Sequence, residues 1–330
     1  MSRADCSTEE RTDQVPADRP AGEYEELFVK LAGAIQEHLD IKGAVDVPAV
    51  RRIVDEKIAE ARLPRPLEVH LDDGRKITLE GRVHFQFEAL MELVQEGHRN
   101  ILMVGPAGSG KTTLAKSMAE ALGLPFGFIS LSAGVTETHL LGRVLPKADG
   151  SWGHVPTRFI EVYEGGGVFL LDEIDGADAN VMVAINAGLA NGLLCNPVTG
   201  QVHVRHKDCF ILAAGNTWGR GGDTQYVGRN QLDAATLDRF ILSTLRVTYD
   251  RDLERDLARG ALSESQADEL LAWVDTLRTR IAEHRLRRVA STRLVVNGVA
   301  AMGRGRTLGD IKTRYFQDWS ADELAKAEGR

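Results

Sequence analysis

Apolar residues change their spacing along the chain, and each change marks a different kind of predicted element. Over residues 27–39 an apolar side chain stands at every fourth position, which predicts one face of a helix. A second helix is expected over residues 47–62, and the prolines that follow it end the helical pattern. Residues 67–81 alternate apolar and polar side chains around an Asp-Gly pair, which predicts a β-hairpin. We therefore expect a helical segment followed by a hairpin over residues 23–81.

Beyond residue 82, short and continuously apolar runs alternate with helical patterns. Continuous apolar strands separated by helices indicate a parallel sheet covered on both faces, because a sheet with one wet face alternates instead. After residue 250 the strand signals stop. The pattern therefore predicts an α/β core over residues 82–249 and a small helical domain over residues 250–330. The predicted strands are Ile101–Val104, Phe126–Leu131, Val168–Leu171, Phe210–Ala214 and Ile241–Leu245, and the predicted helices are 85–97, 111–122, 177–191, 250–260, 263–284 and 291–302.

The composition is typical of a globular protein in a reducing compartment. The chain has 330 residues, of which 43% are hydrophobic and 27% charged, and its formal net charge is −8. This acidic balance argues against a dedicated nucleic-acid coat, although it does not exclude a local basic channel. No run of apolar residues is long enough for a transmembrane helix, and residues 1–22, an expected disordered tail, lack the apolar region of a signal peptide. The three cysteines are too few and scattered for a disulfide framework, so we expect a cytoplasmic protein.

Residues 105–112 read Gly-Pro-Ala-Gly-Ser-Gly-Lys-Thr and satisfy the GxxxxGK[ST] pattern of a phosphate-binding loop, between a predicted strand and a predicted helix. The glycines let the backbone curl so that several N–H groups point at phosphate oxygens, and the helix that begins near Lys111 adds the positive end of its dipole. In this pattern the lysine reaches the β- and γ-phosphates and Thr112 coordinates Mg²⁺. The predicted nucleotide-binding residues are Gly105, Pro106, Ala107, Gly108, Ser109, Gly110, Lys111, Thr112 and Thr113.

A second motif follows the predicted strand at residues 168–171. The strand delivers Asp172 and Glu173 to its carboxyl end, the edge at which open α/β sheets bind ligands. We expect Asp172 to hold Mg²⁺, directly or through water, and Glu173 to orient and deprotonate an attacking water. Asp175 and Asp178 are interpreted as surface or helix-capping acids.

These motifs together resemble the AAA+ ATPases, within the MoxR-like and dynein-related group, and are most similar to the ATPase subunit of aerobic cobaltochelatase. The resemblance covers roughly residues 83–303. It implies an α/β P-loop NTPase fold, with a three-layer αβα parallel sheet, a small α-helical lid after it, and an N-terminal helical and hairpin extension. Four further segments carry it: Phe210–Thr217 resembles the sensor-1 strand, Leu237–Phe240 the L-x-R-F segment, Ala290–Arg293 the start of the sensor-2 helix, and Asn216–Tyr226 the loop after sensor 1 in the cobaltochelatase subunit.

The resemblance also implies roles for polar side chains. Asn216 would orient the attacking water, the alternative being a buried asparagine that caps a loop. Arg239 would be the arginine finger that enters a neighbouring subunit's ATP site, and the alternatives are a pair with an aspartate of its own chain or Arg229 as the finger. Arg293 would approach the γ-phosphate, in cis or in trans, unless it is a surface arginine. His84 lies where the group packs adenine, and a core histidine is an equal expectation.

The function implied is Mg²⁺-dependent ATP hydrolysis by a ring of identical subunits, most often a hexamer, that remodels a separate partner protein. Residues 140–158 fall where the family faces its central pore, so Trp152 is either a substrate-gripping or a packed side chain. A nucleic-acid-associated or phage-encoded motor stays open as an alternative. A monomeric small-molecule kinase is disfavoured by the order of Asn216, Arg239 and Arg293, and the sequence has no Asn-Lys-x-Asp guanine signature, which favours ATP.

Overall fold

The computed structural model describes residues 67–70, 76–79, 82–146, 148–197 and 199–329. The predicted N-terminal tail and the two helices before residue 63 therefore lie outside the described residues. In the predicted hairpin, β1 (Leu67–His70) and β2 (Lys76–Leu79) pair antiparallel, with Leu67 opposite Leu79.

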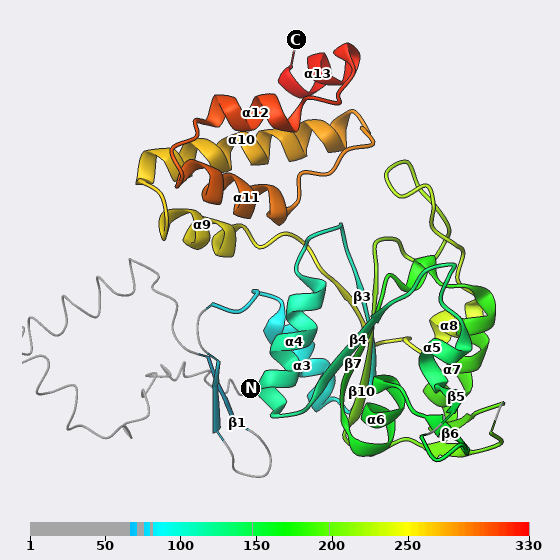
Figure 1. The fold of residues 1–330 in the computed structure, drawn as a ribbon. Helices are drawn as coiled ribbons and strands as arrows, with labels where there is room; N and C mark the ends of the chain where they lie inside the picture. The colour runs from blue at the N-terminus through cyan, green and yellow to red at the C-terminus, as the bar shows by residue number, and fades with distance from the viewer. Residues whose placement is uncertain (1–66, 71–75, 80–81, 147, 198, 330) are drawn as a thin grey trace, which may run out of the picture. The chain divides into compact units, whose positions relative to one another are not determined.

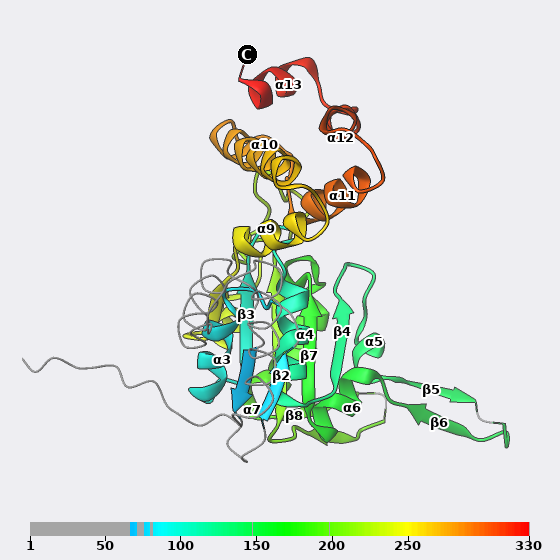
Figure 2. The same ribbon diagram turned by 90° about the vertical axis from the view of Figure 1, so that its left-hand side faces the viewer.

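Five parallel strands form the central sheet (Figures 1 and 2). Their order across the sheet is β11-β3-β10-β7-β4, so the first core strand lies between the last two. Numbered by their sequence within the core, the strands follow the order 5-1-4-3-2. The strands are β3 (Asn100–Val104), β4 (Phe126–Ser130), β7 (Gly167–Asp172), β10 (Cys209–Gly215) and β11 (Thr244–Arg246).

Helices cover both faces of this sheet, which explains why its strands are continuously apolar. Successive residues of β7 point to opposite sides: Val168 and Leu170 pack with α3 (Phe87–Gln95) and α4 (Lys111–Leu122), whereas Phe169 and Leu171 pack with α6 (Arg158–Gly165) and α7 (Ala179–Asn191). In Figure 1, α3 and α4 lie on one side of the sheet, and α6 and α7 lie on the other. The predicted three-layer α/β fold is therefore confirmed.

The fifth strand begins later than its apolar run predicted. Ile241 and Leu242 are 66% and 83% exposed, and Leu242 has a φ of +64°. They belong to a tight turn that follows α8 (Ala234–Asp238), in which Ser243 N–H donates to the Phe240 carbonyl at 3.0 Å. The prediction of a strand over Ile241–Leu245 was therefore wrong for its first half, because the apolar run starts in the turn that reverses the chain.

Smaller elements connect the core strands. The hairpin of β5 and β6 projects away from the sheet in Figure 2. No described helix is both long and apolar enough to cross a membrane. The connecting elements are α5 (Glu137–Leu141), β5 (Arg143–Pro146), β6 (Trp152–Val155), the 3₁₀ turn η1 (Ile174–Gly176), β8 (Leu193–Cys195) and β9 (Val202–Val204).

A helical lid follows the sheet, as the sequence pattern predicts. Four of its five described helices begin at a side chain that accepts from a free N–H group. Asp250 does so for the first helix, and Ser263, Thr307 and Ser320 each form a capping box with the residue three positions later. Two apolar clusters separate from the core of the sheet join these helices. The lid helices are α9 (Arg251–Arg259), α10 (Glu264–Glu283), α11 (Thr292–Met302), α12 (Leu308–Tyr315) and α13 (Ala321–Glu328).

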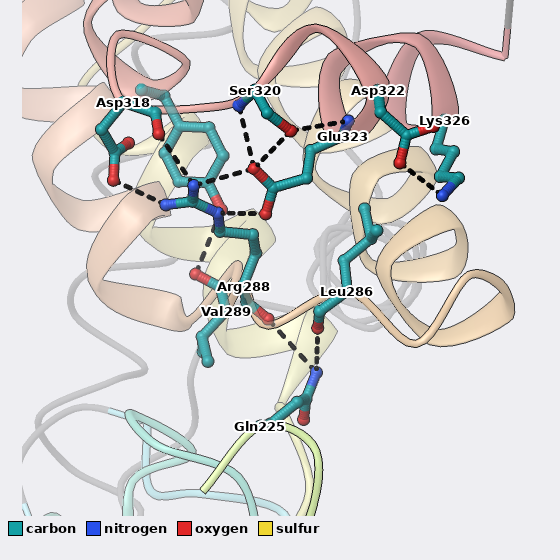
Figure 3. A network of polar contacts seen from close by, with 10 residues as sticks. Gln225, Leu286, Arg288, Val289, Asp318, Ser320, Asp322, Glu323 and Lys326 are labelled. Atoms are coloured by element: carbon teal, nitrogen blue, oxygen red, sulfur yellow. Dashed lines mark hydrogen bonds and ion pairs between the residues drawn. The ribbon is translucent and has the colours of Figure 1, made fainter. Parts of the chain in front are cut away.

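Arg288 ties the last helices of the lid together (Figure 3). Its guanidinium donates to Glu323 at 3.0 Å and to Asp318 at 2.6 Å, and it stacks over Trp319. The hydrogen bonds from Arg288 lower the pKa of Glu323 to about 2. Figure 3 also shows Gln225, from a loop of the core, donating to the carbonyl of Arg288 at 3.2 Å. The lid and the loop that contains Gln225 are therefore connected directly.

A buried ion pair anchors α9 to α10. Glu254 is 1% exposed, and its two oxygens accept from Arg278 at 2.6 and 2.7 Å, while Thr292 donates to the same carboxylate. The guanidinium of Arg278 also lies 4.0 Å from the centre of the Tyr249 ring. A buried ion pair stabilises a fold little more than well-packed apolar side chains of similar volume would. Removing one partner, however, leaves an uncompensated buried charge.

We therefore expect Arg278→Ala to lower the free energy of unfolding of the lid by about 3–5 kcal/mol, because Glu254 would stay buried without its cation. The control is Arg259→Ala, because the ion pairs that Arg259 makes with other described residues are exposed, so this substitution should cost about 0–1 kcal/mol. Urea unfolding followed by tryptophan fluorescence measures both, as Trp273 and Trp319 lie in the lid. Equal losses in the two variants would contradict the assignment.

Candidate active site

The phosphate loop joins β3 to α4 at the carboxyl edge of the sheet. Gly110 precedes the first residue of α4 with a φ of +95°, a conformation that side chains rarely adopt, and no side chain caps the helix. The first N–H groups of α4 therefore remain available to an anion. The hydroxyl of Ser109 is buried without a hydrogen-bond partner among the described residues. The loop thus has the unpaired backbone and side-chain groups that a bound phosphate would use.

Lys111 lies inside this loop and is 7% exposed. Its ammonium group donates to the carbonyls of Gly105 at 2.7 Å and Pro106 at 3.0 Å, and to Asn216 Oδ1 at 3.0 Å. All three of its protons are therefore used. Burial lowers the pKa of Lys111 to about 8, and the charges of Asp172 and Asp175 oppose this effect.

The two acids of the second motif occupy different positions at the end of β7. Asp172 Oδ2 accepts from the hydroxyl of Thr112 at 3.0 Å, so two oxygens of the predicted Mg²⁺ site are neighbours. Glu173 has a φ of +56°, an uncommon value for a residue with a side chain. Its carboxylate accepts from Ser130 Oγ at 3.3 Å and from Arg229 at 3.1 Å. The two neighbouring carboxylates therefore have different hydrogen-bond partners, Thr112 for Asp172 and Ser130 with Arg229 for Glu173.

Asp175 is a buried residue of the candidate site that the sequence interpretation missed. It was expected at the surface or as a helix cap, but it is 0% exposed. Its Oδ2 atom accepts from the N–H of Asn216 at 3.0 Å and from the N–H and hydroxyl of Thr217 at 2.8 and 2.9 Å. Asp178, in contrast, does cap α7 as expected. The signal for Asp175 was its position between Ile174 and Gly176, where neither neighbour is polar.

The predicted arginines separate into two groups. The aliphatic part of Arg293 lies next to the phosphate loop of its own chain. A Cβ atom built on Gly108 of that loop would lie 3.7 Å from Arg293 Cγ. Arg239 ends α8 and donates to the carbonyls of Ala235 and Asn186. Among the described residues it has no hydrogen bond or ion pair with the phosphate loop or with Glu173. The stem of Arg293 therefore lies beside the phosphate loop of its own chain, whereas Arg239 makes no contact with that loop among the described residues.

The remaining predicted residues surround the loop. His84 is 6% exposed, its Nε2 lies 3.0 Å from the Thr248 carbonyl, and its Nδ1 accepts from the Gln86 N–H at 3.2 Å. Both ring nitrogens are thus used by the protein, so of the two expectations the geometry favours a core histidine, and a hydrogen bond to adenine is not available in this arrangement. Thr113 lies exposed in the first turn of α4. The N–H of Ala107 donates to the hydroxyl of Tyr226 at 2.9 Å.

Comparisons with known proteins agree with this architecture. Residues 100–240 match the family model described as AAA domain (dynein-related subfamily). An uncharacterized protein of Staphylococcus aureus (strain USA300) is 27% identical over 194 residues, which are 55% of this chain and 69% of the relative. An uncharacterized protein of strain NCTC 8325 / PS 47 is 26% identical over the same length.

Two solved structures were also similar at low identity. A candidate ATPase from Cytophaga hutchinsonii is 18% identical with a TM-score of 0.40, over 71% of this chain and 81% of the other. NtrX from Brucella abortus is 15% identical with a TM-score of 0.46, over 91% of this chain and 62% of the other. The finer resemblance to the cobaltochelatase subunit stays a prediction. The chain has the α/β P-loop NTPase fold, and its residues 100–240 are similar to the dynein-related AAA domain.

Proposed function

We propose that this protein is a Mg²⁺-dependent ATPase that works as a ring of identical subunits and remodels a separate partner protein. One observation carries the catalytic part of the proposal. Lys111, Thr112, Asp172 and Asn216 come from three adjacent strands or their loops, and hydrogen bonds of 3.0 Å link Lys111 to Asn216 and Thr112 to Asp172. A lysine, a hydroxyl, a carboxylate and an amide that meet at one edge of a parallel sheet are suited to bind a nucleoside triphosphate.

The residues present fit ATP and Mg²⁺. The free N–H groups at the N-terminus of α4 and the unpaired Ser109 hydroxyl would donate to phosphate oxygens, and Lys111 would neutralise their charge. Thr112 and Asp172 would hold Mg²⁺, because adjacent hydroxyl and carboxylate oxygens are its preferred ligands. When bound, the ion supplies positive charge against the β- and γ-phosphates.

Hydrolysis requires a water molecule placed and deprotonated in line with the γ-phosphate. Glu173 accepts the proton of that water at its carboxylate, and Asn216 orients the water through its neutral side-chain amide. Arg293, whose stem lies beside Gly108, faces the phosphate site from the lid of the same chain. These groups would close around the nucleotide and exclude bulk water.

The ring completes the site through Arg239. The phosphate site within one chain has Arg293 beside it but not Arg239. The guanidinium of Arg239 donates to the backbone carbonyls of Ala235 and Asn186 and, among the described residues, pairs with no acid, so it would exchange these two contacts for the phosphates of a neighbouring subunit. Beside it, Ile241 and Leu242 are largely exposed, which suits a surface that a second copy covers. A finger arginine would stabilise the charge that develops on the transferred phosphoryl group.

The hairpin of β5 and β6 is the proposed contact with the partner protein. Trp152 is 70% exposed and Val155 48%, and both lie on a hairpin that projects from the sheet (Figure 2). Exposed aromatic residues on a projecting element are typical of protein contacts. We therefore assign to Trp152 the gripping role rather than a packing role.

We expect Glu173→Gln to keep ATP bound and to lower kcat by about 10²–10⁴-fold, because glutamine preserves the shape of the side chain and removes the base. Lys111→Ala is the contrasting variant and should lose ATP affinity instead, since the phosphates lose their main cation. Nucleotide binding by fluorescence titration and phosphate release by a coupled assay separate the two effects. Turnover at the wild-type rate in Glu173→Gln would refute the assignment of the base.

The trans role of Arg239 makes a separate prediction. Arg239→Ala should bind ATP normally and lose about 10³-fold or more in hydrolysis rate. Mixed with Lys111→Ala, it should recover part of the activity, because a mixed ring pairs an intact phosphate loop with an intact Arg239. Light scattering with a slowly hydrolysed ATP analogue establishes co-assembly. Normal activity of Arg239→Ala alone, or no recovery in co-assembled mixtures, would refute this role.

A further inference from the structure

Arg229 bridges two acids of the site from within its own chain. Its Nη2 atom donates to Glu173 Oε1 at 3.1 Å, and its Nη1 atom lies 3.5 Å from Asp175 Oδ1. The guanidinium is 18% exposed and the Asp175 side chain is fully buried. Asp175 in turn accepts from the backbone of Asn216. The expected base, the expected water-orienting amide and Arg229 thus belong to one connected group.

The loop around Arg229 is fixed on both sides of it. Three residues earlier, the hydroxyl of Tyr226 accepts from the Ala107 N–H of the phosphate loop at 2.9 Å. Immediately after it, Asn230 donates from its backbone to the Asp175 carbonyl at 2.6 Å and from its side chain to the Ala177 carbonyl at 2.9 Å. Arg229 is therefore held between two anchors that both rest on the nucleotide site.

The chain also leaves room for the guanidinium at Gly176. A Cβ at this position would lie 2.9 Å from Arg229 Nη1, too close for an ordinary contact. Gly176 does not have a positive φ, so its backbone would tolerate alanine. The same Cβ would lie 3.2 Å from the Leu131 carbonyl oxygen, so glycine supplies space for the Arg229 guanidinium and for this carbonyl rather than a special backbone conformation.

These contacts decide between a role in cis and one in trans. A trans finger must present its guanidinium to another subunit, but the guanidinium of Arg229 is paired on both nitrogens with acids of its own chain. We propose that Arg229 is a positioning residue that acts in cis and holds the Glu173 carboxylate in its reactive place. The other oxygen of Glu173 accepts from Ser130, so the two contacts fix the rotation of the carboxylate. This inference rests on the proposed ATPase activity and adds a residue to it.

The first test separates positioning from simple support of the fold. Arg229→Lys keeps the positive charge beside the buried Asp175. It loses the two guanidinium nitrogens that contact Glu173 and Asp175 at the same time. We expect this variant to fold, to bind ATP with unchanged Kd and KM, and to lower kcat about 10- to 100-fold, the loss that a misplaced catalytic group causes. Arg220→Ala is the matched control, since Arg220 lies exposed in the same loop. Wild-type kcat in a folded Arg229→Lys protein would overturn the proposal.

A second variant moves the guanidinium without removing it. Gly176→Ala should displace Arg229 from Asp175 and reproduce the kcat loss of Arg229→Lys with unchanged ATP affinity. In the double variant with Arg229→Lys, the two losses should not add, because both disturb the same contact. Additive losses would mean that Gly176 and Arg229 act separately and would overturn the positioning role.

Subunit mixing then distinguishes cis from trans. When Arg229→Lys is mixed with Lys111→Ala, every site able to bind ATP still carries the altered Arg229, so we expect no recovery of kcat. Arg239→Ala mixed with Lys111→Ala is the positive control for a shared site. Recovery in the Arg229 mixture would overturn the cis role. Failure of the Arg239 control alone, in mixtures shown to co-assemble, would refute the trans role of Arg239, while the single-variant kinetics would still decide whether Arg229 positions Glu173.

Discussion

The parallel pairing of β3, β10 and β7 is the constraint on which the site depends. Val104 lies opposite Gly215, and Ala213 lies opposite Leu171, so the three strands reach the same edge of the sheet nearly in register. The residues that follow each strand are then neighbours, although more than a hundred positions separate the first from the last. The 3.0 Å contacts between the phosphate loop and the other two strand ends follow directly from this register.

The fold and the main site were predictable because their signals are local. Continuous apolar runs predicted the buried parallel strands, and the GxxxxGK[ST] pattern predicted a loop that the structure places between a strand and a helix. The fifth strand was predicted too early, since an apolar pattern does not distinguish a buried strand from the exposed turn at Ile241 and Leu242.

The buried polar contacts of Asp175 and Arg229 could not be predicted in the same way. Asp175 is buried because the backbone of Asn216 and Thr217, forty residues later, turns back onto it. A single carboxylate carries no sequence mark of partners so distant. Arg229 was considered only as a finger, and its pairing with acids of its own chain depends on where its loop returns in space. Long-range polar contacts of this kind require the tertiary structure.

The position of β3 in the middle of the sheet also constrains how the chain folds. This strand is made first among the five, yet its two neighbours, β10 and β11, are completed only at residues 215 and 246. The N–H of Gly105 likewise cannot form its hydrogen bond until the Gly215 carbonyl has been synthesised. During synthesis, more than a hundred residues must therefore emerge while β3 and its apolar side chains have no strand beside them. Such distant pairing makes folding slow and leaves apolar surface exposed to aggregation, so the nascent chain is expected to need protection until the last core strand is complete.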